Sequence, residues 1–135
     1  MQGYTAYLLP EAERERLLKS IKPAYKNVIA HHVTYEFGVD DTHPLPPDVF
    51  RASIYGIAND GAGVQTLVVD VNGDGKRPDG KLFHITWSLA DGRKAVESNK
   101  LLETWPISPD KRPQTILFYP IPITLEPAFI PFNGG

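Results

Sequence analysis

The sequence contains no cysteine. This absence excludes disulfide bonds, thiolate metal sites and a cysteine nucleophile, and it favours a reducing compartment. The sequence also lacks a basic N-terminal segment followed by an apolar run, and it has no long apolar run free of proline. We therefore expect neither a signal peptide nor a membrane-spanning segment, and we predict a cytoplasmic protein.

Neither sign of charge is in large excess. The 135 residues include 14 Lys and Arg against 16 Asp and Glu, which gives a formal net charge of −2. A chain without an overall basic charge is poorly suited to bind an extended nucleic acid, so a nucleotide ligand would need a local site. The charge is unevenly distributed, and basic residues outnumber acidic ones between residues 76 and 100.

Length and composition predict one folded domain over residues 1–135, because 41% of the chain is apolar. Apolar patterns predict β-strands over residues 4–9, 30–37, 49–58, 64–71, 81–89 and 116–125. One helix is predicted between Pro10 and Pro23, and one or two helical turns over residues 97–103. This order is typical of an α+β fold dominated by antiparallel strands.

The last predicted strand has apolar residues at every odd position from Leu117 to Leu125, Tyr119 among them. We therefore expect these side chains to share one face. Pro120 and Pro122 are two residues apart, so their missing N–H groups lie on the same edge. That arrangement predicts an edge strand.

Two of the predicted strands each carry a His-apolar-Thr triplet, at residues 32–34 and 84–86. In a strand, side chains at positions i and i+2 point to the same face, so each triplet places one imidazole and one hydroxyl together. Val33 and Ile85 then point into the opposite layer. Two such strands side by side would bring two histidines and two threonines into one cleft.

These residue types suit acid–base chemistry at a phosphodiester. Histidine titrates near neutrality, so one of His32 and His84 can act as base and the other as acid. The hydroxyls of Thr34 and Thr86 can donate hydrogen bonds to the phosphate oxygens, where negative charge develops. The sequence does not assign the base. A coincidental pair of strand histidines is the alternative interpretation.

The remaining histidines have simpler interpretations. His31 would lie on the face opposite His32, with Val33 and Tyr35, if the strand alternates regularly. A slip of one residue would exchange the two histidines, but the spacing to Thr34 selects His32. His43 lies in a proline-rich stretch and is predicted to be a surface residue.

Metal binding is not predicted. Zinc usually takes three or four ligands, and no carboxylate stands at a matching spacing from the histidines. Residues 70–75 match the start of a calcium loop, but the twelfth position is Lys81 where a Glu is required. We interpret this segment as a turn, and we predict no metal and no other cofactor.

Several further residues are candidates for substrate binding. Tyr7 could stack on a base or pack in the core. Lys94 and Ser98, with the neighbouring Arg93 and Asn99, follow the second triplet and could return to the cleft or form a solvated turn.

The two triplets resemble the paired His-x-Ser/Thr signature of the two-histidine (2H) phosphoesterase superfamily. Residues 31–38, 83–86 and 93–102 look most similar to the phosphodiesterase domain of fungal-type tRNA ligases and related RNA-repair-like proteins. The resemblance implies a compact, bilobal α+β fold with pseudo-twofold symmetry and the four motif residues in a central groove. It also implies opening of 2′,3′-cyclic phosphates or cleavage of other phosphodiesters. Some phage relatives destroy the cyclic oligonucleotide signals of bacterial immunity.

The sequence hypothesis is a metal-independent phosphodiesterase that acts on a small nucleotide or an RNA end, with no membrane partner and no extended nucleic acid. His32, Thr34, His84 and Thr86 are the predicted catalytic residues. The alternative is a non-catalytic nucleotide-binding module, or sponge, that keeps the groove. The sequence does not define the oligomeric state or the exact substrate.

Overall fold

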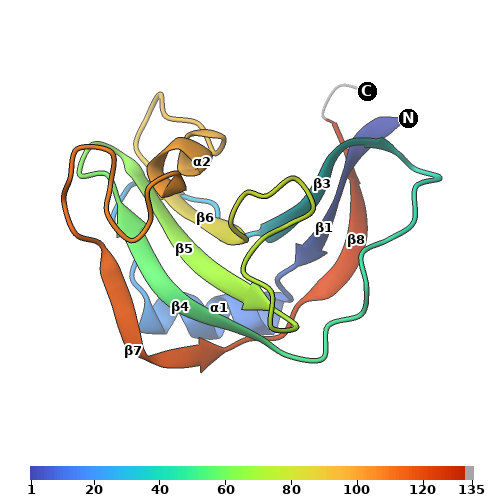
Figure 1. Cartoon of the computed structure of the whole chain (residues 1–135), viewed down its shortest axis with the longest axis horizontal. Coiled ribbons are helices and arrows are strands. Elements are labelled where there is room, and N and C mark those ends of the chain that lie inside the picture. Colours follow the sequence, from blue (N-terminus) through green and yellow to red (C-terminus); the bar gives the residue numbers. More distant parts are fainter. Residues whose placement is uncertain (133–135) are drawn as a thin grey trace.

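The computed structural model describes residues 1–132, which form two antiparallel sheets and two helices (Figure 1). The strands are β1 (Gln2–Leu8), β2 (Asn27–Val28), β3 (His32–Asp40), β4 (Ala52–Asn59), β5 (Val64–Val71), β6 (His84–Leu89), β7 (Thr115–Pro122) and β8 (Glu126–Pro131). The helices are α1 (Glu11–Ser20) and α2 (Glu97–Leu102). One sheet has the order β3-β1-β8 and the other the order β2-β6-β5-β4-β7. The predicted α+β class with mainly antiparallel strands is confirmed.

The five-stranded sheet is buried on both faces around β5. Leu67 and Val69 of β5 belong to the main core, which also contains Leu17 of α1. Val68 instead packs in a second cluster with Leu101 of α2. A strand buried on both faces has a continuous apolar sequence, as β5 does.

The layer opposite the triplets was predicted correctly. Val33 and Ile85 are both completely buried in the main core. Trp87 is also completely buried, and its indole N–H donates a hydrogen bond to the Ile21 carbonyl oxygen at 2.9 Å. These contacts hold the backbone of β3 and β6 in place behind their histidines.

A β-bulge changes the alternation of β3 after the first triplet. The pairing with β1 steps from Glu36 to Thr34 and leaves Tyr35 without a partner. Thr34 and Phe37 consequently lie opposite β1 residues that are two apart, so they share a face although they are three residues apart. Regular alternation would have placed Glu36 on that face instead.

The end of the chain differs from the prediction in part. β7 pairs only with β4 and is an edge strand, as the prolines indicated. Tyr119 is 81% exposed, whereas Ile123 and Leu125 are buried, so the predicted apolar face is not buried along its whole length. Pairing jumps from Ile121 to Ile116, so the residues between them leave the β4 ladder. Strand β8 was not predicted; it contains two prolines, which an edge strand tolerates.

Candidate active site

A cavity of about 480 Å³ lies where the two sheets meet. All four predicted catalytic residues line it: His32 and Thr34 from β3, and His84 and Thr86 from β6. The two strands lie next to each other without strand pairing, because they belong to different sheets (Figure 1). The structure therefore brings the two triplets together in one site.

His84 is the first residue of β6, and its tautomer is defined by the backbone. Its Nδ1 atom lies 2.9 Å from the Leu82 carbonyl oxygen. A carbonyl oxygen can only accept, so Nδ1 carries the hydrogen and the neutral ring keeps its lone pair on Nε2. Burial lowers the pKa of His84, and the positive charges of Arg77 and Lys81 lower it further. His84 is thus neutral near pH 7, with Nε2 available as an acceptor.

His32 is partly buried and contacts a second histidine. Its Nδ1 atom lies 2.9 Å from Nδ1 of His31, and its ring lies 5.2 Å from the Tyr4 ring. Burial lowers the pKa of His32 to about 4, and the neighbouring His31 and His84 contribute to this shift. His32 is therefore also neutral near pH 7.

His31 lies elsewhere than its predicted position. Its side chain is exposed and does not line the cavity, whereas Val33 is buried. Strand β3 begins only at His32, and Ala30 has a φ of 45°, so regular alternation does not extend back to His31. The selection of His32 over His31 as the residue of the cleft agrees with the structure.

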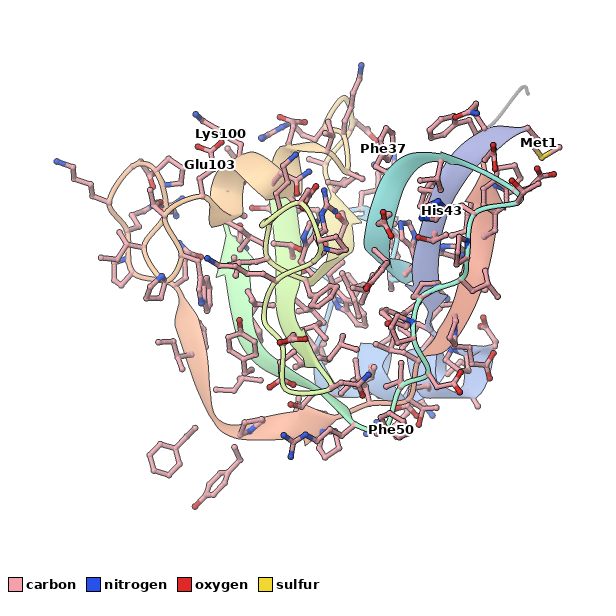
Figure 2. All side chains as sticks on the ribbon, turned by 45° about the vertical axis from the view of Figure 1, so that its right-hand side comes forward. Met1, Phe37, His43, Phe50, Lys100 and Glu103 are labelled. Atoms are coloured by element: carbon pink, nitrogen blue, oxygen red, sulfur yellow. The ribbon has the colours of Figure 1, made fainter. Side chains whose placement is uncertain are left out.

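His43 lies outside the cavity, in front of the three-stranded sheet in Figure 2. Its Nε2 atom lies 3.2 Å from a Glu36 carboxylate oxygen, and its side chain is 33% exposed. His43 is thus partly buried and not fully exposed to solvent.

The Thr86 hydroxyl is connected to α2. Its Oγ1 lies 2.9 Å from Oγ of Ser98, which is completely buried, and 3.4 Å from the Ala95 carbonyl oxygen. The second contact is at the long limit for an O–H donor. When Ser98 donates to Thr86, the Thr86 hydrogen is therefore free to turn toward a ligand. Ser98 does not line the cavity but orients a residue that does.

Three charged residues of the loop between β5 and β6 were not predicted as part of the site. Arg77, Asp79 and Lys81 all line the cavity. Arg77 is only 7% exposed, and its Nε donates to Asp79 at 2.9 Å. The basic character of residues 76–100 indicated a positive region, but no sequence pattern indicated that this loop lies beside the histidines.

The tyrosine that lines the cavity is Tyr4 and not Tyr7. Tyr7 is 1% exposed, packs in the core and donates its hydroxyl to the Pro47 carbonyl oxygen at 3.0 Å. The two tyrosines are three residues apart in β1 and so point to opposite faces. Tyr4 lines the cavity together with Phe37, and their rings are stacked at 5.9 Å (Phe37 is labelled in Figure 2).

Of the four candidate residues in the segment after β6, one lines the cavity. Lys94 is exposed and does not line the cavity, and Arg93 forms ion pairs with Asp60 and Glu97 at 2.8 and 2.9 Å. Asn99 does line the cavity, and its buried Oδ1 has no hydrogen-bond partner within residues 1–132. A substrate contact is therefore supported for Asn99 and not for Lys94.

Comparison with known proteins finds no match to this chain. No family model, no curated protein and no solved structure matches it. Over residues 1–132, no three His, Asp or Glu side chains form a group that could hold a metal ion, and neither helix is long and apolar enough to span a membrane. The chemistry of the cavity itself must therefore support any function.

Proposed function

We propose that this chain is a metal-independent phosphodiesterase of the 2H type, which hydrolyses a small nucleotide phosphodiester. The observation that supports it best is the convergence of both His-x-Thr triplets on one cavity. The substrate would be a 2′,3′-cyclic phosphate, an RNA end or a cyclic oligonucleotide, since these compounds share the same reactive group.

In this proposal His84 is the general base. Its Nε2 takes a proton from a water molecule as the water oxygen attacks phosphorus. The bond between phosphorus and the leaving oxygen then breaks, and that oxygen takes a proton from Nε2 of His32. The Leu82 carbonyl oxygen accepts the Nδ1 hydrogen of His84, so it leaves Nε2 as the acceptor and stabilises the ring once it is protonated, which favours this assignment of the two roles.

Binding of the substrate phosphate would favour the protonated form of His32, which is the form that acts as the acid. His32 is neutral near pH 7 in the free protein because its pKa is about 4. An anion close to an imidazole raises the pKa of that imidazole. Binding of the negatively charged diester would therefore bring a proton to His32 together with the substrate.

Hydrogen-bond donors surround the expected position of the phosphate. Thr34 and Thr86 line the cavity and can donate from their hydroxyls, and Arg77 and Lys81 supply positive charge. Fixed donors of this kind stabilise the charge that develops on the non-bridging oxygens. Asp79 partly neutralises Arg77, so the site retains a modest positive charge and suits one phosphate.

One observation favours a different function. Both imidazoles have lowered pKa values in the free protein, whereas acid–base catalysis needs one of them protonated. A non-catalytic nucleotide-binding module would not need that proton. Such a module would bind the same ligands and release them unchanged.

A screen with product analysis distinguishes the two functions. The purified protein is incubated with 2′,3′-cyclic mononucleotides, cyclic oligonucleotides, dinucleoside phosphates and RNA ending in a cyclic phosphate, and the products are identified by mass spectrometry. Hydrolysis that His84→Ala abolishes supports the enzyme. Binding of these ligands without any product would instead support the module.

A further inference from the structure

A second cavity of about 420 Å³ adjoins the first. The two cavities share three lining residues, Lys81, His84 and Asn99. The second cavity extends from these residues along α2 to Trp105, beyond the end of that helix. His84 therefore stands at the boundary between two compartments.

Each compartment is large enough for a nucleoside. Sites for small molecules typically have volumes of roughly 300–1,000 Å³, and the two cavities measure about 480 and 420 Å³. A cyclic mononucleotide has one base and would occupy only one of them.

The second compartment has its own aromatic side chain. Trp105 lines it and packs against Gly56 of β4, where an added Cβ would overlap the indole ring. The glycine allows this close approach, and the approach holds the ring in place. A fixed aromatic ring beside a cavity is a suitable surface on which a base can stack. Tyr4 and Phe37 form the equivalent surface in the first compartment.

Polar groups at the boundary match a ligand that passes through it. The Asn99 side chain lines both compartments, and its buried Oδ1 has no hydrogen-bond partner within residues 1–132. A buried amide oxygen without a donor costs free energy, which a ligand hydroxyl or amino group would recover. Lys81 also faces both compartments, and Lys76 faces the second. These positive charges suit a phosphate at the boundary, next to His84.

We propose that the substrate is a phosphodiester with a nucleoside on each side of the bond that is cleaved. One base stacks on Tyr4 and Phe37, the other stacks on Trp105, and the phosphate lies at His84. This inference rests on the proposed function, because it assumes that the phosphate at the boundary is the one that reacts.

The kinetic test compares three diesters that differ only in the groups beside the phosphate. They are the adenosine dinucleotide ApA and two analogues in which one nucleoside or the other is replaced by methyl. Stacking of one base is worth about 1–3 kcal/mol, so each truncation should lower kcat/KM by about fivefold or more. Trp105→Leu should lower kcat/KM for ApA and for the analogue that keeps the nucleoside of the second compartment. It should not change kcat/KM for the analogue that lacks this nucleoside.

The binding test uses the unmodified protein and does not depend on a variant folding. The chain has two tryptophans, and Trp87 is completely buried, so a ligand in the second cavity should quench mainly Trp105. The probe is ApA with a phosphorothioate link, which is hydrolysed slowly. Quenching of Trp105 is expected at a lower concentration of this dinucleotide than of adenosine monophosphate, because the mononucleotide fills only one compartment. Trp105→Phe identifies the source of the signal.

The outcomes separate the two proposals. The two-nucleoside site would be overturned by equal kcat/KM for ApA and both analogues, or by hydrolysis of cyclic mononucleotides alone. Either result would still support phosphodiesterase activity. Quenching of Trp105 by the dinucleotide without hydrolysis of any diester would support the two-nucleoside binding site and contradict the proposed phosphodiesterase activity. An unchanged Trp105 signal at saturating dinucleotide would also overturn the site.

Discussion

The hydroxyl groups of Thr86 and Ser98 lie 2.9 Å apart, in the space between β6 and α2. This contact connects the second triplet to a helix that follows it in the chain. Ser98 is completely buried, so its hydroxyl is shielded from water and Thr86 is its partner. The orientation of the Thr86 hydroxyl, which is one proposed donor to the phosphate, therefore depends on Ser98.

Substitution of Ser98 by Ala should therefore reduce activity, although no side chain that lines the cavity is removed. Thr86 would turn its hydrogen to the Ala95 carbonyl oxygen, its remaining partner at 3.4 Å. Loss of one oriented hydrogen bond is worth about 1 kcal/mol, so kcat should fall by about fivefold to tenfold with little change in KM. Steady-state kinetics measures both parameters.

Ser108→Ala is the matched control for this change. Ser108 is also buried, but its hydroxyl bonds Asp110 and lies outside the cavity. Its substitution should affect stability and leave kcat unchanged. Equal kcat in the Ser98 variant and the unmodified protein would show that Ser98 does not orient Thr86.

Removal of His31 should raise the pKa of His32. His31 lowers that pKa through its charge, and its Nδ1 lies 2.9 Å from Nδ1 of His32. In His31→Ala the His32 imidazole should titrate at a higher pH than in the unmodified protein. NMR titration of the imidazole C–H signals measures the shift, and an unchanged or lower value would contradict the contact.

Acid should destabilise the fold through the cavity histidines. The pKa of His32 is about 4 in the folded chain and about 6.5 in the unfolded chain. Between these values the unfolded chain binds a proton that the folded chain does not, so stability falls as the pH falls from about 6.5 to 4. The slope is up to about 1.4 kcal/mol per pH unit for each such histidine.

Urea denaturation between pH 4.5 and 7 measures this slope. Several carboxylates with lowered pKa values, Asp60 among them, also lose stabilising interactions in acid. The informative quantity is therefore the difference between His32→Gln and the unmodified protein, which should have the steeper dependence. Parallel curves would mean that His32 is not desolvated.

Chelators should leave hydrolysis unchanged. In the proposed mechanism, the two imidazoles and the cations Arg77 and Lys81 carry out the proton transfer and charge stabilisation for which other phosphodiesterases use metal ions. The measurement is kcat/KM before and after dialysis against EDTA. Loss of activity that one divalent metal restores would contradict the metal-independent mechanism.

The sequence predicted the positions of the catalytic candidates because their strands obey simple rules. Val33 and Ile85 are apolar residues between polar ones, and regular alternation places them in the core, as observed. His32 and His84 are the first residues of β3 and β6, so each triplet lies in the regular part of its strand. No bulge intervenes within either triplet.

The rest of the site depends on contacts that no local pattern encodes. Phe37 lines the cavity only because the bulge at Tyr35 shifts the alternation. Arg77 and Lys81 line the site because the loop between β5 and β6 folds back on itself, with a bridge between Lys76 and Leu82 that the sequence patterns did not indicate. Tyr7 was the predicted aromatic candidate, but it lies on the buried face of β1 and Tyr4 on the cavity face, which only the assembled sheet defines.

The most direct test of the central claim is kcat/KM for His32→Ala and His84→Ala on the diester that the screen identifies, with His43→Ala as the control outside the cavity. General acid–base groups typically contribute about 10²–10⁴-fold. Each cavity variant should therefore lose activity by that factor while it retains the circular dichroism spectrum of the folded protein, and His43→Ala should stay close to the unmodified protein. Full activity in either cavity variant would contradict the two-histidine mechanism.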